Sequence, residues 1–259
     1  MLACPQCGLP LSISDRAATC SNGHSFDRAR EGYFNLLIGG RLNSKAPRGD
    51  TPDALAARRR FLAAGSYEPI AAALAEMVGQ PDGPVLDVGC GEGYYLSMLS
   101  LPHRYGLDMS KSAVQMAARL LPEAQFVVGS AYRLPILDST VAAVLSVFAP
   151  HPWDEFRRVL LPGGYWVAVT PGSCHLQEMR PRLQGPSELK ALDRQHRRST
   201  PPEEASTATR LEYQLELSAQ DARDLFLMTP IRWQTGADHA ASGDVRTVTV
   251  DVWISSSRG

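Results

Sequence analysis

Four side chains near the start of the chain have the types and the spacing of a metal site. They form a CxxC pair and, after twelve further residues, a CxxxH pair: Cys4, Cys7, Cys20 and His24. Two close pairs of thiolate and imidazole donors suit a tetrahedral Zn²⁺ ion, and Gly8 and Gly23 supply the tight turns that such pairs need. Four protein ligands leave no open coordination position, so we expect a structural ion. A disulfide set or small core residues would explain the cysteines but not this spacing.

A glycine-rich segment further along the chain has the character of a ligand-binding turn. The sequence VLDVGCGEGYY covers residues 85–95 and carries Gly89, Gly91 and Gly93 after a short apolar strand. Glycines at such a turn let the backbone approach a ligand and expose the amides at a helix N-terminus. We interpret Cys90 in this turn as a small packing residue and not as a nucleophile.

Three acidic residues narrow the kind of ligand that this turn would bind. Asp87 lies inside the strand, where a nicotinamide-binding fingerprint has an apolar residue. Glu92 would repel a pyrophosphate but would tolerate a cationic amino-acid group. Asp108 ends the next strand, fifteen residues after Gly93, where a carboxylate can accept both hydroxyls of a ribose. The pattern favours a nucleoside that carries a positive charge.

Composition restricts the class of protein. The chain has 259 residues, of which 44% are hydrophobic and 20% charged, as in ordinary globular proteins. No run of eighteen apolar residues and no basic start followed by an apolar core is present, so we expect no membrane span and no signal peptide. Five cysteines, four of them in metal-type or glycine-rich contexts, suit a reducing compartment, and we expect a cytoplasmic protein.

Positive charge is concentrated in the first part of the chain. Residues 1–60 hold nine Lys and Arg against five Asp and Glu, whereas the remainder holds seventeen against twenty-two. The basic residues behind the cysteine cluster are Arg41, Lys45, Arg48, Arg58, Arg59 and Arg60. A basic face attracts polyanions, although a merely solvated helix face would have the same charge.

The elements that must position these residues can be read from the apolar pattern. Helices are expected over 53–64 and 69–78. Strands at 85–88, 105–108, 126–128, 141–147 and 165–170 alternate with helices at 94–99, 111–121 and 153–160. This alternation predicts a parallel sheet covered on both faces. Strands at 211–217 and 247–254, around a helix at 219–228, would add an antiparallel edge pair.

Ahead of that pair, residues 173–210 are expected to form an insertion over the carboxyl edge of the sheet, where doubly wound folds bind ligands. The insertion is polar and basic, with Arg180, Arg182, Lys190, Arg194, Arg197 and Arg198.

Residues 84–170, with their DxGCGxG motif, resemble the class I S-adenosylmethionine-dependent methyltransferases. The resemblance implies an α/β, Rossmann-like fold with a mostly parallel seven-stranded sheet and a small N-terminal zinc-binding domain. It also implies that Asp87 and the glycines hold the methionine end, that Asp108 holds the ribose, and that Ser130 and Ala131 border the adenine. The expected cosubstrate-binding set is Tyr67, Asp87, Gly89, Gly91, Gly93, Tyr94, Tyr95, Asp108, Ser130, Ala131 and His175.

Further motifs extend the resemblance over most of the chain. They include CPxCxxxL at 4–11, CxxxHxFDxAxEGYxNLL at 20–37, RRxFLxxGxYxP at 58–69, SxxRLP at 130–135 and LxPGGxxxxxTPGxxHLxE at 160–178. The chain is similar to the large-subunit (23S) ribosomal RNA guanine-N1 methyltransferases of the RlmA type. We accordingly expect a zinc-binding RNA-recognition module at 1–36, a linker and helices at 37–82, and the methyltransferase domain at 83–259.

The resemblance also implies an activity and partners. The enzyme would transfer a methyl group to N1 of a guanine in a 23S rRNA hairpin near the peptide exit tunnel, leaving S-adenosylhomocysteine, and would act as a homodimer. One branch of the family is linked to tylosin-type macrolide resistance, and we expect this chain to belong to it. The alternative is a methyltransferase of a small molecule, such as a quinone or a natural product, with a structural zinc knot.

The residues that act on the base are less clear from the sequence. Candidates for the general base are His175 and Asp138, and His175 could equally have a structural role. Trp153 or Tyr132 could stack on an extruded base, although a core role is the stronger expectation for each. Phe148-Ala-Pro150 stands where amino methyltransferases carry an Asn/Asp-Pro-Pro-aromatic motif, and the missing amide or carboxylate argues against methylation of an exocyclic amine.

Overall fold

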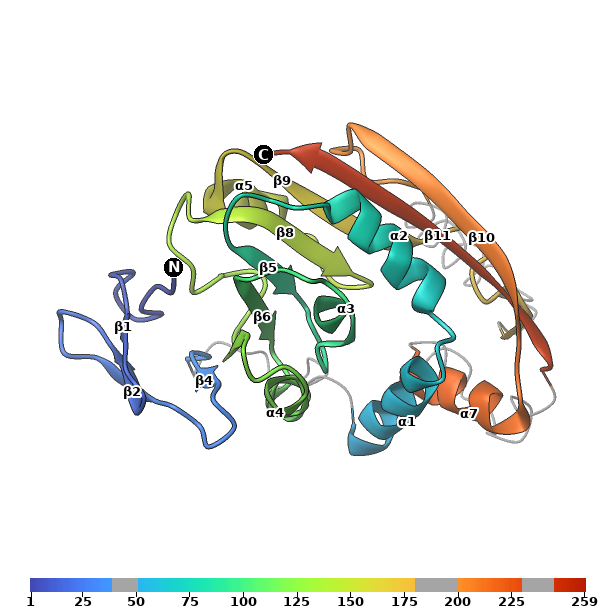
Figure 1. Cartoon of the computed structure of the whole chain (residues 1–259), viewed down its shortest axis with the longest axis horizontal. Coiled ribbons are helices and arrows are strands. Elements are labelled where there is room, and N and C mark those ends of the chain that lie inside the picture. The colour runs from blue at the N-terminus through green and yellow to red at the C-terminus, as the bar shows by residue number, and fades with distance from the viewer. Residues whose placement is uncertain (39–50, 180–199, 230–244) are drawn as a thin grey trace, which may run out of the picture. The chain divides into compact units, whose positions relative to one another are not determined.

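The computed structural model describes residues 1–38, 51–179, 200–229 and 245–259 (Figure 1). The chain forms two compact units. The first comprises Met1–Gly49, Ala75–Ala168 and Ser257–Gly259, and the second comprises Asp50–Leu74 and Val169–Ser256. Several of the basic residues noted in the sequence lie outside the described residues: Arg41, Lys45, Arg48, Arg180, Arg182, Lys190, Arg194, Arg197 and Arg198.

The centre of the first unit is a parallel sheet. Its strands, in spatial order, are β8 (Val141–Val147), β5 (Val85–Val88), β6 (Arg104–Asp108) and β7 (Gln125–Val128). Every residue of β5 and β8 is buried, as expected for strands covered on both faces. The register pairs Asp87 with Gly106 and Asp108 with Val128, so the strands end at a common carboxyl edge.

Helices follow the strands as predicted. They are α3 (Tyr94–Ser97), α4 (Lys111–Leu120) and α5 (Trp153–Val159), preceded in the chain by α2 (Glu68–Val78). The start of α4 is fixed by Ser110, whose hydroxyl accepts the N–H of Ala113. Its apolar side, including Val114 and Ala117, is buried. The helix thereby holds the chain between β6 and β7 against the sheet.

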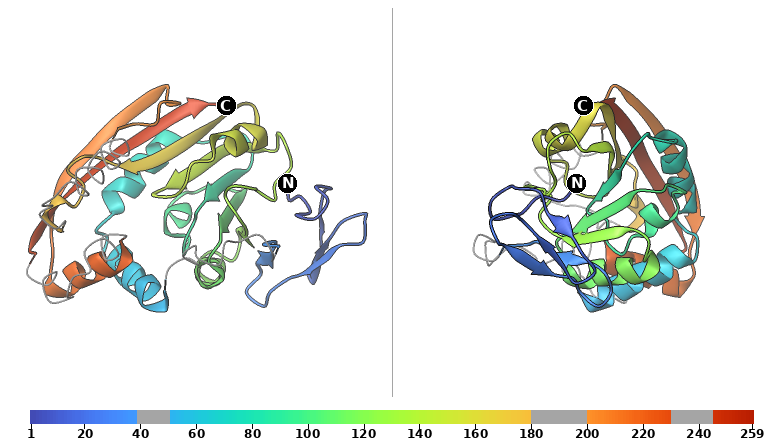
Figure 2. Two further views of the ribbon diagram at one scale, coloured as in Figure 1. Left: turned by 180° about the vertical axis from the view of Figure 1, so that it is seen from behind. Right: turned by 60° about the vertical axis from the view of Figure 1, so that its left-hand side comes forward.

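The N-terminal module is joined to this sheet. Its own three strands, β1 (Ser12–Ile13), β2 (Ala17–Thr19) and β3 (Ser25–Asp27), are antiparallel. A fourth strand, β4 (Phe34–Asn35), pairs in parallel with β7 at the edge of the large sheet. Figure 2 shows the N-terminal module, in blue, beside the green central strands from two further directions. The large sheet therefore has eight strands and not the expected seven. A two-residue strand carries no periodicity, which is why the pattern did not reveal it.

Side-chain contacts also fasten the module to the first unit. Arg28 donates to Gln125 Oε1 at 3.2 Å. Glu31 accepts from Gln115 at 2.9 Å and from Arg119 at 2.8 Å. The amide of Ala3 donates to a backbone carbonyl in the segment between β7 and β8. The predicted boundary at residue 36 rests on motifs and stays a prediction.

The second unit contains a helix pair and an antiparallel strand pair. Its elements are α1 (Pro52–Ala63), α7 (Ala219–Met228), β10 (Thr207–Glu216), β11 (Thr247–Arg258) and the 3-10 helix η1 (Gln177–Met179). The helices α1 and α7 pack together, and β10 pairs with β11 along its whole length. The strand β9 (Leu160–Pro171) begins in the first unit and ends beside β11 in the second.

The predicted antiparallel edge pair is therefore confirmed, although β10 begins four residues earlier than expected. In the described part of the chain, no helix combines the length and the apolar character needed to cross a membrane.

Candidate functional site

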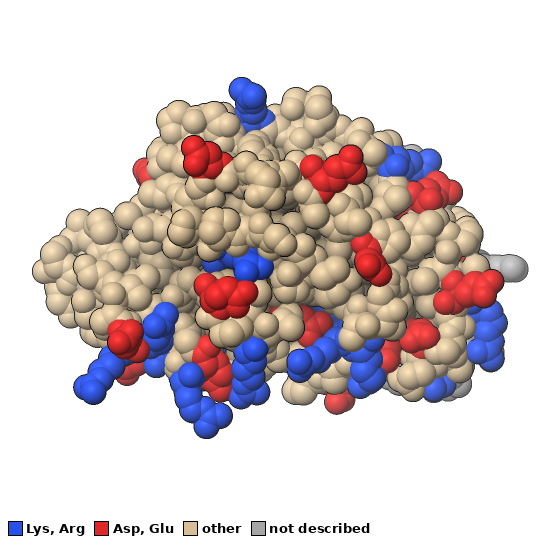
Figure 3. Space-filling model, viewed as in Figure 1, with Lys and Arg blue, Asp and Glu red and all other residues tan. Residues whose placement is uncertain are grey.

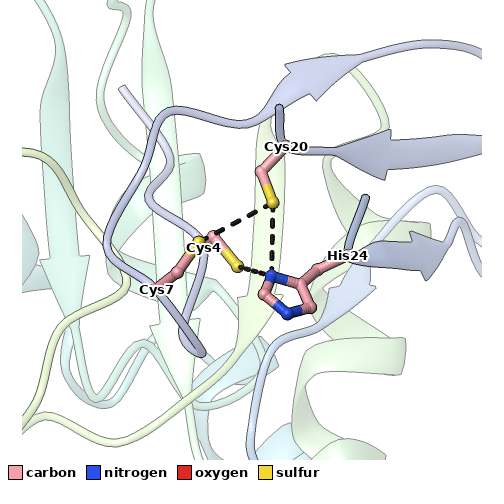
Figure 4. Close-up of side chains that lie close together, drawn as sticks. All are labelled: Cys4, Cys7, Cys20 and His24. Carbon is pink, nitrogen blue, oxygen red and sulfur yellow. Dashed lines mark hydrogen bonds between the residues drawn. The ribbon is translucent and has the colours of Figure 1, made fainter. Parts of the chain in front are cut away.

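The four N-terminal ligand residues converge (Figure 4). Their sulfur and imidazole atoms all lie within 4.8 Å of one another. His24 Nδ1 is 3.5 Å from Cys4 Sγ and 3.3 Å from Cys20 Sγ, and Cys7 Sγ is 3.7 Å from Cys20 Sγ. Tetrahedral bonds of about 2.3 Å to sulfur and 2.0 Å to nitrogen would place two sulfurs about 3.8 Å apart and sulfur about 3.5 Å from nitrogen. The donor set fits Zn²⁺, with Nδ1 as the histidine ligand.

Local backbone geometry creates this cluster. Gly8 and Gly23 have φ of 77° and 79°, and their amides donate to the carbonyls of Cys4 and Cys20. A Cβ at either glycine would meet no atom within 4 Å, so the left-handed backbone and not lack of space requires glycine there. Burial alone would raise the pKa of the Cys20 thiol, but hydrogen bonds from the backbone of His24 and Asn22 and from neighbouring side chains lower it to about 6. A thiolate is the form that a metal needs.

The glycine-rich turn lies at the carboxyl edge of the parallel sheet. Gly89, Gly91 and Gly93 all have positive φ, and Gly93 is the residue before α3. The amide of Gly89 donates to Leu107 O at 2.7 Å, which ties the turn to the end of β6. A Cβ on Gly89 would lie 2.4 Å from Ala149 Cβ, so no larger residue fits. The turn is thus held between the ends of β6 and β8.

Asp87, immediately before this turn, is a buried acid with unused hydrogen-bonding capacity. Its side chain is 2% exposed, and Oδ1 has no hydrogen-bond partner among the described residues. Burial, and then the nearby charge of Asp108, raise its pKa to about 7. An unpaired buried oxygen is costly, and a donor or cation supplied by a ligand would remove that cost. This observation fits the cationic amino-acid end of a nucleoside ligand.

Asp108 links the turn to the next strand. Its Oδ2 accepts the N–H of Gly91 at 3.0 Å, and its Oδ1 accepts that of Ser110 at 2.8 Å. These two hydrogen bonds fix the orientation of the carboxylate at the end of β6. The sequence-based prediction placed Asp87 and Asp108 near the turn, and the parallel register of β5 and β6 brings them together.

The remaining residues predicted for the first unit lie close by. The amide of Gly129 donates to Asp108 O at 3.0 Å, so Ser130 and Ala131 follow directly from that point. Tyr94 and Tyr95 begin α3, and their rings meet edge to face at 5.0 Å. Cys90 is buried beneath the turn, and burial raises the pKa of its thiol well above the usual value, which suits a packing residue.

Tyr67 and His175 belong to the second unit, where their rings lie 6.4 Å apart. Tyr67 also meets Phe61 edge to face at 5.1 Å and is buried. His175 Nδ1 accepts the N–H of Asp251 at 3.3 Å, so a neutral imidazole carries its proton on Nε2. In the sequence, only the family resemblance places Tyr67 and His175 in one set, and the fold brings their rings close together.

An ion pair between the exposed Arg210 and the buried Asp251, which the sequence did not reveal, holds the segment that carries His175. Asp251, in β11, is 0% exposed and accepts from Arg210 Nε at 2.8 Å and from Nη2 at 3.0 Å. Its Oδ2 also accepts the N–H of Cys174 at 2.8 Å. The available signal was an acidic residue within the otherwise apolar strand TVTVDVWI. The carboxylate positions the turn before His175.

Asp138 is far from the glycine-rich turn along the strands. It stands three residues before β8, at the amino edge of the parallel sheet, whereas the turn lies at the carboxyl edge. Its carboxylate is 2.7 Å from Arg158 Nη1. This placement does not favour Asp138 as the general base.

The two candidate stacking residues, Trp153 and Tyr132, differ in how far they are packed against other side chains. Trp153 packs against Trp166 at 4.5 Å and Phe156 at 5.6 Å, which agrees with the expected core role. Tyr132 is 72% exposed, so the expectation of a core role was wrong for this residue. The reason is that residues 130–133 form a tight turn beyond the end of β7, closed by a bridge between Ser130 and Arg133.

Basic residues near α1 are partly engaged within the second unit. Arg60 donates to Asp224 at 2.9 Å and 2.6 Å, and Arg58 donates to Met228 O at 3.2 Å. Asp224 is buried, so Arg60 neutralises an internal charge and is not simply part of a basic face. On the face in Figure 3, Lys and Arg side chains also gather beside the N-terminal module and α4, interspersed with acidic groups.

Comparisons with known proteins agree with this geometry. Residues 2–45 match the zinc-ribbon family model described as RlmA, N-terminal, and residues 85–164 match a methyltransferase domain model. A Micromonospora griseorubida protein described as a 23S rRNA (guanine-N1)-methyltransferase is 38% identical, covering 99% of this chain and 97% of that protein. The Streptomyces fradiae 23S rRNA (guanine(748)-N1)-methyltransferase is also 38% identical, over 93% of this chain and 88% of its own.

Among solved structures, the YcgJ protein of Bacillus subtilis covers 73% of this chain and 97% of its own, at 16% identity and a TM-score of 0.49. The Micromonospora griseorubida relative covers nearly the whole chain, and so extends across both the zinc cluster and the glycine-rich turn. The chain belongs to the family of 23S rRNA (guanine-N1)-methyltransferases that carry an RlmA-type N-terminal zinc ribbon.

Proposed function

We propose that this enzyme methylates N1 of the guanine that corresponds to position 748 of 23S rRNA. The observation that carries the choice of nucleotide is the 38% identity to the Streptomyces fradiae guanine-748 enzyme over 93% of the chain. A macrolide-resistance role of the tylosin type is part of the same proposal. The family match at residues 2–45 disfavours a small-molecule methyltransferase, because such an enzyme has no need of an RNA-type module.

For the cosubstrate, we propose that S-adenosylmethionine lies on the glycine-rich turn. Asp87 Oδ1 would accept from its ammonium group, and Asp108 would accept from the two ribose hydroxyls. The support is the unpaired buried oxygen of Asp87 and the fixed orientation of Asp108. The other members of the proposed set are Gly89, Gly91, Gly93, Tyr94, Tyr95, Ser130 and Ala131, with Tyr67 and His175 from the second unit.

The reaction needs alignment more than it needs a strong catalytic group. The sulfonium supplies an electrophilic methyl group, and N1 of guanine becomes nucleophilic when its proton leaves. A base that is splayed out of the RNA and held in line with the methyl group, away from water, reacts by direct displacement. His175 remains the candidate for accepting the N1 proton, through Nε2, because Nδ1 accepts from the backbone of Asp251.

RNA recognition is assigned to the zinc module and to the basic residues that follow it. Arg30 is exposed in the module and Arg59 is exposed in the helix that follows it, and phosphates are the groups that such side chains bind. A homodimer with a shared RNA-binding cleft, and a cytoplasmic location, complete the proposal. Size measurement of the enzyme with and without RNA tests the dimer.

Mapping the modified nucleotide tests the central claim. Unmethylated 23S rRNA is incubated with the enzyme and S-adenosylmethionine, and a primer-extension stop marks N1 methylation. We expect one stop, at the guanine equivalent to 748, which becomes weaker with the Asp108→Ala variant at limiting S-adenosylmethionine. A stop at a neighbouring guanine would overturn the choice of nucleotide, and methylation of free phenols without any stop would overturn RNA as the substrate.

A further inference from the structure

The strand β10 lies at one edge of the large sheet. It pairs residue for residue with β11 from Thr207 to Glu216. In the part of the chain that the structure describes, no strand pairs with the other side of β10. The strand at the opposite edge, β4, has two residues, whereas β10 has ten. The second unit therefore carries a long edge strand.

The sequence of β10 lacks the features that usually protect such an edge. Edge strands are commonly short, bulged or supplied with Lys or Pro. β10 reads TATRLEYQLE, without Lys or Pro, and its register with β11 is unbroken. Its one cation, Arg210, is engaged by Asp251 and Glu212 of the same chain. A long edge without these features is a template for a further strand.

The pairing with β11 determines which backbone groups of β10 face outward. The amide of Leu217, one residue beyond the strand, donates to Arg246 O at 2.8 Å, and these two residues continue the register of the pair. Hydrogen-bonded and non-hydrogen-bonded pairs alternate along an antiparallel ladder, so the odd-numbered residues of β10 bond to β11. The N–H and C=O groups of the even-numbered residues point away from β11, namely those of Ala208, Arg210, Glu212, Gln214 and Glu216.

The apolar face of β10 is incompletely covered. Leu211 and Leu215 are half-buried, whereas Val252 and Val248, which lie opposite them on β11, are 0% exposed. The difference arises because β11 has a strand on each side and β10 has one neighbour among the described strands. A strand added beside β10 would cover the open flank of this face.

We propose that β10 pairs antiparallel with β10 of a second copy of this chain, about a twofold axis at Leu211. This register pairs every residue from Thr207 to Leu215 and sets Leu211 opposite Leu211 of the partner subunit. Arg210 then lies opposite the partner's Glu212, and Glu212 opposite the partner's Arg210. Opposite charges directly across two strands are favourable, and both residues direct their backbone groups outward.

Other registers suit the strand less well. A twofold axis at Arg210 or at Glu212 would set two like charges directly opposite each other, which is unfavourable. An axis at Tyr213 would pair Arg210 with the partner's Glu216 but would shorten the ladder. An axis between two residues would oppose outward-facing backbone groups to inward-facing ones. The axis at Leu211 therefore combines the longest ladder with complementary charges.

The inference rests on the homodimer of the proposed function and assigns its surface. A cysteine at the axis tests it. Leu211→Cys would place two thiols in a non-hydrogen-bonded pair with Cα atoms about 4.5 Å apart, within the range of about 4.4–6.8 Å that a disulfide needs. Thr209→Cys is the matched control, because Thr209 lies opposite Tyr213 of the partner subunit and away from its own counterpart.

The zinc-loaded full-length variants are incubated with oxidised glutathione and separated on a non-reducing gel, with wild type as the background for the native cysteines. We expect most of Leu211→Cys to run as a covalent dimer, and Thr209→Cys to form no more of it than wild type. Equal amounts of covalent dimer in the two variants would overturn the axis at Leu211.

A pair of charge reversals gives a second measurement, by sedimentation equilibrium. Glu212→Lys would set a cation opposite the partner's Arg210 at two symmetric positions, and we expect the dimer to dissociate about 10-fold more readily. Glu216→Lys makes the same change on the same edge but faces no charge in this register, so it should stay within about 2-fold of wild type. Unchanged binding of S-adenosylhomocysteine shows that both variants fold.

The possible failures are distinguishable. A larger effect of Glu216→Lys than of Glu212→Lys would overturn the proposed register. A wild-type dimer that neither charge reversal weakens, and that Leu211→Cys does not trap, would overturn β10 as the surface and leave the homodimer of the proposed function standing. A wild type that is monomeric with and without RNA would overturn both the surface and the homodimer.

Discussion

The zinc cluster and the glycine-rich turn lie in the same unit but differ in how complete they are. In the cluster, four donor atoms lie within 4.8 Å of one another and suffice for one spherical ion. In the turn, a buried carboxylate keeps an oxygen with no partner among the described residues, and its pKa is raised to about 7. The first arrangement needs one ion, whereas the second leaves a buried acceptor for a bound ligand to satisfy.

This difference shows how the two centres depend on the rest of the chain. The cluster is made by two local turns within the first twenty-four residues. The ligand-binding turn exists only because β5, β6 and β8 lie side by side, which brings Asp108 and Ala149 to the glycines. Damage to the cluster should therefore act on the module, and damage to the turn should act on the cosubstrate.

The largest effect is expected from removing a zinc ligand. Cys7→Ser leaves three ligands, and structural zinc accounts for about 10–16 kcal/mol of apparent binding free energy in small zinc modules. We expect the variant to lose stoichiometric zinc and rRNA methylation while it binds S-adenosylhomocysteine within a few-fold of wild type. Metal analysis measures the zinc content, and calorimetry measures the binding of S-adenosylhomocysteine. Unchanged RNA affinity would remove the module from RNA recognition.

The next effect is expected at Asp87. Asp87→Asn removes the charge that would pair with the cosubstrate ammonium, and hydrogen bonds to charged groups contribute about 1.5–3 kcal/mol. Because the ionised carboxylate is the binding form and its pKa is about 7, wild-type affinity should rise as the pH increases through 7. The variant should bind weakly and without this dependence. Calorimetric titration from pH 6 to pH 8 measures both.

Asp87→Asn should also change how the free energy of unfolding of the ligand-free enzyme depends on pH. The folded-state pKa of Asp87 lies above its ordinary value of 3.8, so the folded protein binds more protons than the unfolded chain between about pH 4 and pH 7. The contribution of this group to the free energy of unfolding therefore falls as the pH rises through that range. Denaturant titrations should show this fall in wild type relative to Asp87→Asn. The same pH dependence of stability in wild type and variant would contradict the raised pKa of the buried Asp87 carboxyl.

A similar but more local loss is expected at Asp108. Asp108→Ala removes the acceptor proposed for the ribose and releases the amide of Gly91. We expect cosubstrate binding to weaken by about 1–3 kcal/mol, the cost of leaving such groups unpaired. Zinc content should not change. An unaltered dissociation constant would overturn the ribose assignment.

The smallest effect is expected where the module is fastened to the sheet. Hydrogen bonds from Gln115 and Arg119 lower the pKa of Glu31 to about 2. The stabilisation is therefore present above the ordinary pKa of 4.5 and is lost only as the pH falls through about 2. Glu31→Gln should slightly lower the denaturation midpoint by the same amount from pH 6 to pH 8. A difference between the two midpoints that changes from pH 6 to pH 8 would argue against the pairing of Glu31 with Gln115 and Arg119.

Much of the fold could be predicted from the sequence because its signals are local. The apolar runs gave β5, β8 and α7 with their observed bounds, and the CxxC and CxxxH spacing gave the cluster. Asp87 and Asp108 could be placed because each stands at a fixed distance from a strand end. These features are set by local sequence and do not depend on which elements pack together.

Other features depend on long-range packing and were not predictable. The strand β4 is defined by its partner β7, and the pairing of Arg210 with Asp251 joins residues forty-one positions apart. The exposure of Tyr132 likewise follows from the turn beyond β7, and residue type alone favours burial. Sequence spacing cannot supply such partners.

The short pairing between β4 and β7 has a consequence for solubility. Without β4, the backbone groups of β7 would form an open sheet edge, and such edges pair readily with other chains. We therefore expect the zinc module, through β4, to prevent strands of other chains from pairing with β7. Chelation of the metal should make the enzyme self-associate in a concentration-dependent way before its central sheet unfolds, which light scattering alongside circular dichroism would reveal.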